Sequence, residues 1–378
     1  MVRPGFHWTT SLLAQSAASG KRLAYDLYID LPWVEEAAKG QVKEAVEGFF
    51  AKIDNMPRPN RLFVPAFQHG HTFFPPKDLP FALDRRCQGL NLLREFSHRA
   101  IFERRLVVYG IADLLRWAAP NTPKEDDPFT RYPEWLEVNI ENACNQAHDG
   151  KFASPFHPQV WQALIALAQA LARQYPPLHG LLIQCRLSLR DLLGYSEAAR
   201  AAYIRAYQVD PVDLDQSLRD SKNPVSIGHW AVWRRRVITD LVGAVSRTFR
   251  AGRVQARVAV RGIAPYYSKV FSPTQRLMAR QDWLEWLNAG HADEVILHAN
   301  WLDNRNQTWL KDGMTALKRA KNQRVYVNPL IICREGSKVV SLQEQWVRLE
   351  QQVVWPYVVI AIQHPNDLER VQQFLQSL

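Results

Sequence analysis

The sequence predicts an α/β fold, a (β/α)8 barrel of the TIM type with enlarged loops after its third and fourth strands. Short β-rich runs alternate along the 378 residues with amphipathic helical patterns, which is typical of a parallel sheet with crossover helices. Several runs are almost continuously apolar, as expected for strands that are buried on both faces. The eight predicted strands are Leu23–Asp30, Arg61–Gln68, Leu106–Ile111, Gly180–Arg186, Gln255–Arg261, Asp293–Asn300, Arg324–Ile331 and Tyr357–Gln363.

The helical segments between these runs carry apolar residues at spacings of three and four, which places the apolar residues on one face of a helix. The longest such segment is His229–Arg250, in which the arginines 234–236 face partly away from the stripe and are expected to be solvated. Pro158–Tyr175 has the same pattern, and Asn366–Leu378 is expected to be the last helix. A helix after the eighth strand completes eight β/α units.

Two connections are longer than a barrel requires: Pro120–Ala153 after the third strand and Leu187–Gly228 after the fourth. Both leave the end of the barrel at which active sites of this fold lie, so we expect them to build the walls of a cleft. No repeat and no flexible linker divides the chain. We therefore expect an N-terminal arm over residues 1–20 and a single barrel domain over residues 21–378.

The composition is that of a globular domain, with 47% hydrophobic and 11% aromatic residues. No run approaches the roughly 18 apolar residues of a membrane helix, so no membrane span is expected. The net charge is +10, but the basic residues are spread along the chain, and nucleic acid is not expected as a partner. Residues 6–18 make a poor signal-peptide core, which leaves a cytoplasmic location and export by an unrecognised leader both open.

Four groups of residues resemble, in their order and spacing, the motifs of one known family. They are Tyr132-Pro133-Glu134-Trp135-Leu136; Pro155–Val160 followed by Tyr175–Ile183; Leu193-Gly194-Tyr195-Ser196 with Arg200 and Asp210-Pro211; and Trp233-Arg234-Arg235 with Gln281–Leu287. With these segments the chain, from about Leu23 to its end, resembles the glycosyl-hydrolase-like family ten, a family of barrel proteins related to glycosidases. The resemblance implies a (β/α)8 barrel that handles carbohydrate at the carboxyl ends of its strands.

Two strand ends depart from the family's pattern. The fourth strand of the family typically delivers one or two aspartates that are expected to be catalytic, and Gln184 stands where the first of them is expected. At the end of the second strand, Phe67 takes the place of an arginine and His71 that of an aspartate. An amide can hydrogen-bond a sugar hydroxyl but can be neither the acid nor the nucleophile, so Gln184 is assigned to substrate binding.

Glycoside hydrolysis usually needs two carboxyl groups that flank the scissile bond. Three aspartates lie at or beyond the ends of predicted strands and are the catalytic candidates: Asp30 in the first strand, Asp113 after the third and Asp303 after the sixth. A helix cap or a loop ion pair is the competing interpretation of each of them. The sequence does not single out two of the three as a pair.

Other polar residues at predicted strand ends are assigned to the substrate. Arg186 and Arg261 end neighbouring strands, and two guanidinium groups at a barrel mouth favour an anionic or hydroxyl-rich ligand, although a loop carboxylate is an alternative partner. Trp301 offers an aromatic face to a sugar ring, unless it packs beneath the loops. The predicted carbohydrate-binding residues are Gln68, His69, His71, Gln184, Arg186, Arg261, Asn300, Trp301 and Asn328.

The alternating histidines His69 and His71 also permit a zinc site, with His298 or His364 as a third ligand. Lining of a sugar cleft or structural hydrogen bonding explains the same pair without a metal. The sequence has no carboxylate at the end of the eighth strand and no lysine in the fourth, so no metal is expected. Motifs of the GxGxxG, P-loop, HExxH and GxSxG types do not occur, and no cofactor is expected.

Two functions therefore remain open. The first is a glycoside hydrolase that acts on an oligo- or polysaccharide at the C-terminal mouth of the barrel. The second is a non-catalytic barrel that binds a glycan or another anionic polymer after losing its catalytic carboxylates. The resemblance favours the first, and the many amides at the strand ends favour the second; a metal-dependent hydrolase is a third interpretation. The sequence does not indicate the sugar or the oligomeric state.

Overall fold

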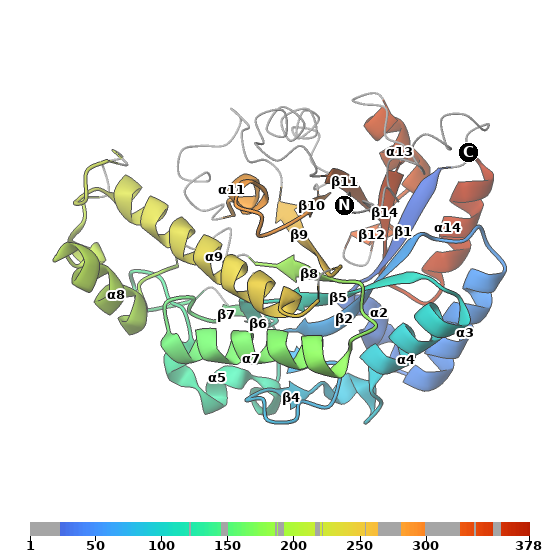
Figure 1. Cartoon of the computed structure of the whole chain (residues 1–378), viewed down its shortest axis with the longest axis horizontal. Helices are drawn as coiled ribbons and strands as arrows, with labels where there is room; N and C mark the ends of the chain where they lie inside the picture. The colour runs from blue at the N-terminus through green and yellow to red at the C-terminus, as the bar shows by residue number, and fades with distance from the viewer. Residues whose placement is uncertain are drawn as a thin grey trace, which may run out of the picture.

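A computed structural model of the chain describes residues 23–120, 122–144, 150–185, 187, 193–215, 220, 222–253, 255–263, 281–298, 326–335, 338–350 and 357–378. Within these residues, eight parallel strands form a closed barrel and helices cover its outside (Figure 1). The barrel strands are β1 (Ala24–Ile29), β2 (Arg61–Gln68), β5 (Val107–Asp113), β8 (Gly180–Gln184), β9 (Arg257–Ile263), β10 (Glu294–His298), β11 (Tyr326–Ile332) and β14 (Tyr357–Ile362).

The barrel closes because β1 pairs with β2 as well as with β14. The order around the ring is β1-β14-β11-β10-β9-β8-β5-β2, and Tyr28 lies opposite Phe63 at the closing pair. Every one of these neighbouring pairs is parallel. All eight strands therefore end at the same rim, where this fold carries its chemistry.

The strands are buried on both faces, and their apolar sequences follow from that. Val358, Val359 and Ile360 in β14 are each 0% exposed, although successive side chains point to opposite faces of the sheet. The small residue Gly180 in β8 makes room for an aromatic neighbour, because a Cβ atom there would lie 2.6 Å from the ring of Tyr109. Bulky apolar residues and a few small ones thus fill the inside and the surface of the barrel.

The helices that wrap the barrel bury one apolar face each. In α7, for example, Val160, Leu164, Leu167 and Leu171 recur at helical spacing and are all buried. The covering helices are α2 (Leu31–Ala37), α3 (Val42–Asp54), α4 (Leu92–His98), α7 (Pro158–Gln174), α9 (Ile227–Arg250), α11 (Trp283–Asn288), α13 (Leu342–Glu350) and α14 (Asp367–Gln376).

The long connections after β5 and β8 build structure at the strand-end side of the barrel. The first contains the antiparallel pair β6 (Arg116–Ala118) and β7 (Lys151–Phe152) and the short helix α5 (Pro128–Arg131). The second contains α8 (Glu197–Tyr207), which projects from the barrel together with the amino-terminal half of α9 (Figure 1). We call α8 and this half of α9 the wing. The wing has a small apolar core of its own: Tyr195, Tyr203, Leu214, Ile227, Trp230 and Ala231.

The predicted barrel is confirmed, and each of the eight predicted strands overlaps an observed one. The sequence analysis missed the short strands that decorate the barrel: β3 (His71–Thr72), β4 (Ala82–Leu83), β12 (Arg334–Glu335) and β13 (Lys338–Val339). It also expected the arginines 234–236 to be solvated, whereas Arg234 is fully buried and only Arg236 is exposed. The proposed N-terminal arm lies outside the described residues. Among the described helices, none has the length and apolar character needed to cross a membrane.

A buried ionic cluster holds the strands together near their amino-terminal ends. Arg61, the first residue of β2, donates Nη1 and Nη2 to the two carboxylate oxygens of Glu294 at 2.6 Å each, and its Nε to Asp26 Oδ2 at 2.7 Å. The guanidinium also lies 5.6 Å from the ring centre of Tyr357. One side chain from β2 thus binds two carboxylates, from β1 and β10, across the inside of the barrel.

Replacing Arg61 by Leu should lower the free energy of unfolding by about 3–5 kcal/mol, because the change leaves two carboxylates buried without their cation. Denaturant unfolding of both proteins measures the difference. The matched control is Arg85→Leu, since Arg85 is 67% exposed and pairs with Asp126 on the surface. The control should lose at most about 1 kcal/mol. Equal losses in the two variants would contradict a structural role for the buried cluster.

The same cluster should make stability depend on pH. Burial raises the pKa of Asp26 to about 6, against the opposing effects of Arg61 and Tyr357. The folded state therefore holds this proton more tightly than the unfolded state, so stability should decrease as the pH rises from about 4 to about 6 and then level off. Asp26→Asn should remove this part of the slope, which denaturant titrations at several pH values will measure. An unchanged slope would show that other groups produce it.

Candidate active site

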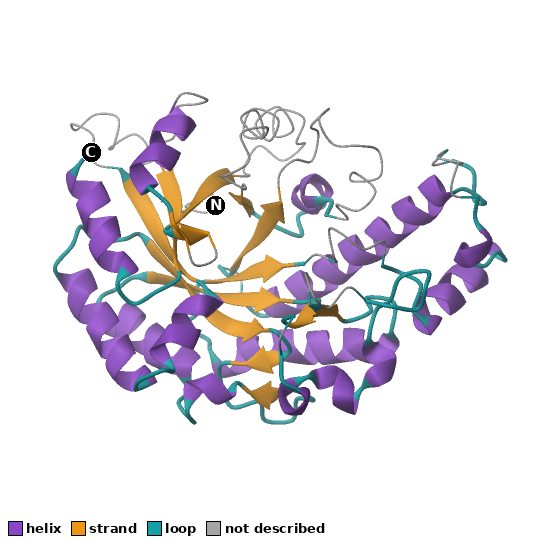
Figure 2. Cartoon of the chain, turned by 180° about the vertical axis from the view of Figure 1, so that it is seen from behind, coloured by secondary structure: helices purple, strands orange, loops and turns teal. Residues whose placement is uncertain are grey.

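The candidate site lies where the parallel strands end, and neighbouring strands place their polar residues at one level. Asp113 of β5 is in register with Gln184 of β8, and Gln184 is in register with Arg261 of β9. Asp30 directly follows β1, and Gln68 ends β2. The strand arrows point toward the side that carries the wing (Figure 2). Five neighbouring strands therefore place polar residues at one rim, as expected for parallel strands that end on the same side.

Tyr28 is the centre of this arrangement, although the sequence analysis did not single it out. Its hydroxyl oxygen accepts hydrogen bonds from Arg261 Nη1 at 3.0 Å and from Gln184 Nε2. Burial raises the pKa of Tyr28, the charge of Arg261 acts to lower it, and the charges of Asp30 and Asp113 raise it further. The phenol therefore keeps its proton at neutral pH and holds an arginine and an amide in fixed positions.

Arg261 carries the positive charge of the site. Burial alone acts to lower its pKa, but Tyr28, Asp30 and Asp113 together hold the pKa above the ordinary value of arginine. Its guanidinium carbon also lies 5.3 Å from the ring centre of Tyr28. The two aspartates thus act electrostatically on the same Tyr28–Arg261 pair, so these four side chains form one electrostatic unit.

Asp30 is fixed by contacts on both of its oxygens. Oδ1 accepts from the backbone N–H of Leu31 at 3.0 Å and so caps α2, while Oδ2 accepts from Gln363 Nε2 at 3.4 Å. Gln363 is itself held, since its Oε1 accepts from the backbone N–H of Arg334 at 2.9 Å. The capping role that competes with catalysis is therefore present, but it occupies one oxygen and leaves the second to a long amide contact.

Asp113 is more deeply placed than Asp30, with an exposed fraction of 6%. Its Oδ1 accepts from the backbone N–H of Arg116 at 3.4 Å. Burial and, after it, the charge of Asp113 raise the pKa of the neighbouring Cys185 thiol. Asp113 is thus a nearly buried carboxyl group beside Cys185 and within electrostatic reach of Arg261.

The hairpin after β2 turns tightly at the rim. His69 (φ 50°) and Gly70 (φ 75°) are both in the left-handed region, and Gln68 pairs with His71 across the turn. A Cβ atom at Gly70 would lie 2.5 Å from Pro128 Cγ, so only glycine allows the turn to approach α5 this closely. Beside this turn, Gln68 is 4% exposed and its Oε1 is buried without a hydrogen-bond donor among the described residues.

The two histidines of the hairpin do not form a metal site within the described residues. Burial lowers the pKa of His69 to about 3, with smaller contributions from the charges of Arg116 and Arg86, so the ring is neutral at pH 7. His71 Nδ1 lies 2.8 Å from the carbonyl oxygen of His69 and is engaged locally. No group of three potential ligands from His, Cys, Asp and Glu occurs in the described part of the chain.

Asn328 lies with the ionic cluster near the amino-terminal ends of the strands, because its Nδ2 donates to Glu294 Oε1. It is therefore not among the residues that meet around Tyr28. The remaining predicted site residues lie outside the described part of the chain: Arg186, Asn300, Trp301 and Asp303.

A carboxylate that the sequence analysis missed ties the two long loops together. Glu137, after β5, is 0% exposed, and its Oε1 accepts from the backbone N–H groups of Gly194 at 3.0 Å and Ser196 at 2.9 Å. Its Oε2 accepts from the hydroxyls of Ser154 at 2.6 Å and Ser196 at 3.1 Å. Burial raises its pKa, and these hydrogen bonds act against the rise. The only signal in the sequence was its position next to Leu136, at the end of a family motif.

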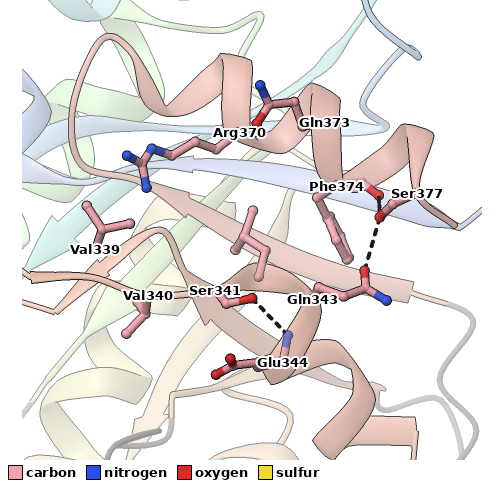
Figure 3. A pocket seen from close by; sticks show the side chains of 10 residues that line it. Val339, Val340, Ser341, Gln343, Glu344, Arg370, Gln373, Phe374 and Ser377 are labelled. Atoms are coloured by element: carbon pink, nitrogen blue, oxygen red, sulfur yellow. Dashed lines mark hydrogen bonds between the residues drawn. The ribbon is translucent and has the colours of Figure 1, made fainter.

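A separate groove lies outside the barrel between α13 and α14 (Figure 3). In it, Ser341 Oγ accepts from the backbone N–H of Glu344 at 3.2 Å, and Ser377 Oγ donates to Gln343 Oε1 at 3.1 Å. Both hydroxyls are thus engaged within the groove, and none of the residues assigned to carbohydrate lines it. The groove is not part of the candidate site.

Comparison with protein families gives the geometry a context. The model of the family described as "Glycosyl hydrolase-like 10" matches residues 38–348. The chain belongs to this glycosyl hydrolase-like family. The resemblance predicted from the motifs is thus confirmed for the family as a whole. A comparison with curated protein sequences finds no match.

Solved structures similar to this glycosyl hydrolase-like chain are barrels of glycosidases. The β-galactosidase from Rahnella sp. R3 is 12% identical with a TM-score of 0.58, over 95% of this chain and 56% of that one. The β-galactosidase from Bacillus circulans sp. alkalophilus is 10% identical with a TM-score of 0.59, over 90% of this chain and 50% of that one. The endo-1,4-beta-mannanase from Rhizomucor miehei is 11% identical with a TM-score of 0.52, over 95% and 96%.

At these identities the similarity is one of fold. This chain spans about half the length of the two galactosidase chains. The reaction and the substrate therefore have to be argued from the site of this protein.

Replacing Glu137 by Ala should lower the free energy of unfolding by at least about 3 kcal/mol, since four buried donors lose their acceptor. Denaturant unfolding measures this loss, and limited proteolysis should show earlier cleavage in the loops after β5 and β8. The matched control is Glu134→Ala, which removes an exposed carboxylate from the same loop and should change stability by less than about 0.5 kcal/mol. Unchanged proteolysis of the Glu137 variant would show that the loops are held by other contacts.

Proposed function

We propose that this protein is a glycoside hydrolase that cleaves an oligo- or polysaccharide at the C-terminal mouth of its barrel, with Asp30 and Asp113 as the carboxyl pair. The observation that carries the proposal is that these two aspartates, from different strands, act on the same Tyr28–Arg261 pair. Membership of a glycosyl hydrolase-like family supports the reaction class.

The chemistry requires one carboxyl group to protonate the leaving oxygen and the other to attack the sugar or activate water. Asp113, with little exposure, suits the acid, and Asp30, which is held through Leu31 and Gln363, suits the second role. Arg261 interacts electrostatically with both aspartates and stabilises negative charge on their carboxylates. Gln184 cannot transfer a proton, so its part is to hold the Tyr28 hydroxyl and to bind sugar.

Two side chains of the hairpin after β2 can accept hydrogen bonds from substrate hydroxyls. Gln68 Oε1 is buried and lacks a donor among the described residues, and a sugar hydroxyl can supply that donor. The neutral His69 ring lies in the same hairpin and can accept or donate a further hydrogen bond. Amide and imidazole groups of this kind orient a sugar without competing for the catalytic proton.

A carbohydrate-binding barrel without catalysis is the second candidate. It is favoured by Gln184, an amide at the position where the family pattern leads us to expect an aspartate. In that case Asp30 and Asp113 act only as a helix cap and as a charge partner of Arg261. The two candidates make different predictions for the same pair of variants.

Asp113→Asn and Asp30→Asn should each reduce hydrolysis by about 10²–10⁴-fold, because an amide cannot perform general acid–base or nucleophilic catalysis. Release of reducing ends from a panel of polysaccharides measures turnover, and affinity electrophoresis on the same polysaccharides measures binding. Binding should change little. The matched control is Asp54→Asn, since Asp54 is a half-exposed residue in the last turn of α3 that pairs with Arg104. It should keep full activity.

Three results separate the alternatives. Loss of turnover with retained binding supports the proposed pair. Full turnover in both aspartate variants shows that other carboxylates carry the reaction. Retained binding by the wild-type protein with no reducing ends from any polysaccharide supports the non-catalytic barrel instead.

A further inference from the structure

Arg234 is completely buried in the wing although its guanidinium has no hydrogen-bond partner. The side chain is 0% exposed, and its Nε, Nη1 and Nη2 meet no acceptor in the described part of the chain. One turn earlier, Trp230 Nε1 is buried in the same unpartnered state. The two side chains are stacked, with the guanidinium carbon 3.7 Å from the centre of the indole ring. The wing thus holds a cluster of buried N–H groups and a positive charge without an acceptor.

A buried cluster of this kind destabilises the folded protein unless it has an acceptor. Burying an ionised group without a partner is strongly unfavourable, and contact with the indole ring offsets only part of that cost. Arginine and tryptophan side chains are donors only, so they cannot satisfy each other by hydrogen bonding. The missing component is therefore an acceptor with negative charge.

The surroundings of Arg234 connect it to the walls of the candidate active site. Gly194 (φ 118°) approaches so closely that a Cβ atom there would lie 2.8 Å from both Cδ and Nε of Arg234. The N–H of Gly194 is held by Glu137, the carboxylate that ties the two long loops together. Tyr195 packs on Trp230, with 4.5 Å between the two ring centres. The cluster thus lies directly against the loop after β8, at the point where Glu137 ties it to the loop after β5.

We propose that Arg234 and Trp230 bind the carboxylate group of an acidic sugar, so that the glycan handled by this protein carries carboxylates. The identification of the ligand as a glycan rests on the function proposed above; the need for an anion does not. The planar guanidinium fork matches the two oxygens of a carboxylate, and the indole N–H adds a third donor. A net charge of +10 favours the approach of an anionic polymer. Gly194 and Tyr195 pack against Arg234 and Trp230 in the free protein. Binding therefore requires the segment that contains them to move.

The test compares an oligogalacturonate with the same oligosaccharide after its carboxyl groups have been reduced to neutral alcohols. Calorimetric titration measures the affinity of the wild-type protein, Arg234→Met and Trp230→Phe for both ligands. The matched control is Arg236→Met, which removes the same charge from an exposed position two residues away. The wild-type protein and the control should prefer the acidic ligand by about tenfold or more. Arg234→Met should lose this preference, and Trp230→Phe should weaken it.

Thermal unfolding adds a measurement that a purely structural arginine would move in the opposite direction. If Arg234 is a ligand-binding residue that has no partner in the free protein, replacing it by Met removes an unpaired buried charge. The unfolding temperature of the free protein should then rise by several degrees. If Arg234 is a structural element, the variant should unfold at a lower temperature. Trp230→Phe keeps the ring and removes only the N–H, so it tests the site should Arg234→Met fail to fold.

Several results would overturn the proposal: equal affinity of the wild-type protein for both ligands, including no binding of either, an unchanged preference in Arg234→Met, or a lower unfolding temperature of that variant. The outcome is separable from that of the hydrolysis test. Acidic preference without cleavage leaves the anion site standing and removes the hydrolase. If cleavage is the same in Arg234→Met and on the carboxyl-reduced ligand, the hydrolase stands and the anion site is removed.

Discussion

Closure of the parallel sheet between β1 and β2 is the constraint on which the candidate site depends. It brings Tyr28 of β1 across the inside of the barrel to Arg261 of β9 and Gln184 of β8, which are distant in sequence. An open sheet would leave β1 and β9 four strands apart along the pairing order, with no means for one phenol to bind both side chains. The same closure puts Asp30 and Asp113 within electrostatic reach of one arginine.

The two ends of the barrel use arginine in different ways. At the amino-terminal end, Arg61 donates to two carboxylates at 2.6–2.7 Å, and all three side chains are largely buried. At the carboxyl-terminal end, Arg261 donates to a neutral tyrosine, while two aspartates influence it through charge. The first arrangement lies near the amino-terminal strand ends, away from the rim at which this fold carries its active sites. The second places an arginine, a phenol and an amide together at the carboxyl-terminal rim, where barrels of this type carry their active sites.

The fold and part of the site could be predicted because both follow from local rules. Strands that are buried on both faces appear in the sequence as apolar runs. Polar residues that end parallel strands must share a rim, so Asp30, Asp113, Gln184 and Arg261 were predicted to lie together. Tyr28 was missed because the sequence does not say which residues of a strand point inward. Asn328 was placed at the rim for the same reason, whereas contact with Glu294 holds it elsewhere. Arg234 was assigned to solvent because helical periodicity describes packing on the barrel and carries no information about the second core in the wing.

Three of the segments that carry the family resemblance meet in the loops after β5 and β8. Leu136 leads into Glu137, Glu137 binds the backbone of Gly194 and Ser196, and Gly194 rests on Arg234. Apart from Glu137, which directly follows the first motif, these residues come from three of the four motif groups, and none of them ends a barrel strand. A mutation at Glu137 should therefore disturb both the loops and the surroundings of Arg234, whereas a mutation at Arg234 should leave the Glu137 hydrogen bonds intact. The hydrogen bonds of Glu137 therefore hold the loops independently of Arg234, whereas the surroundings of Arg234 depend on the loops that Glu137 holds.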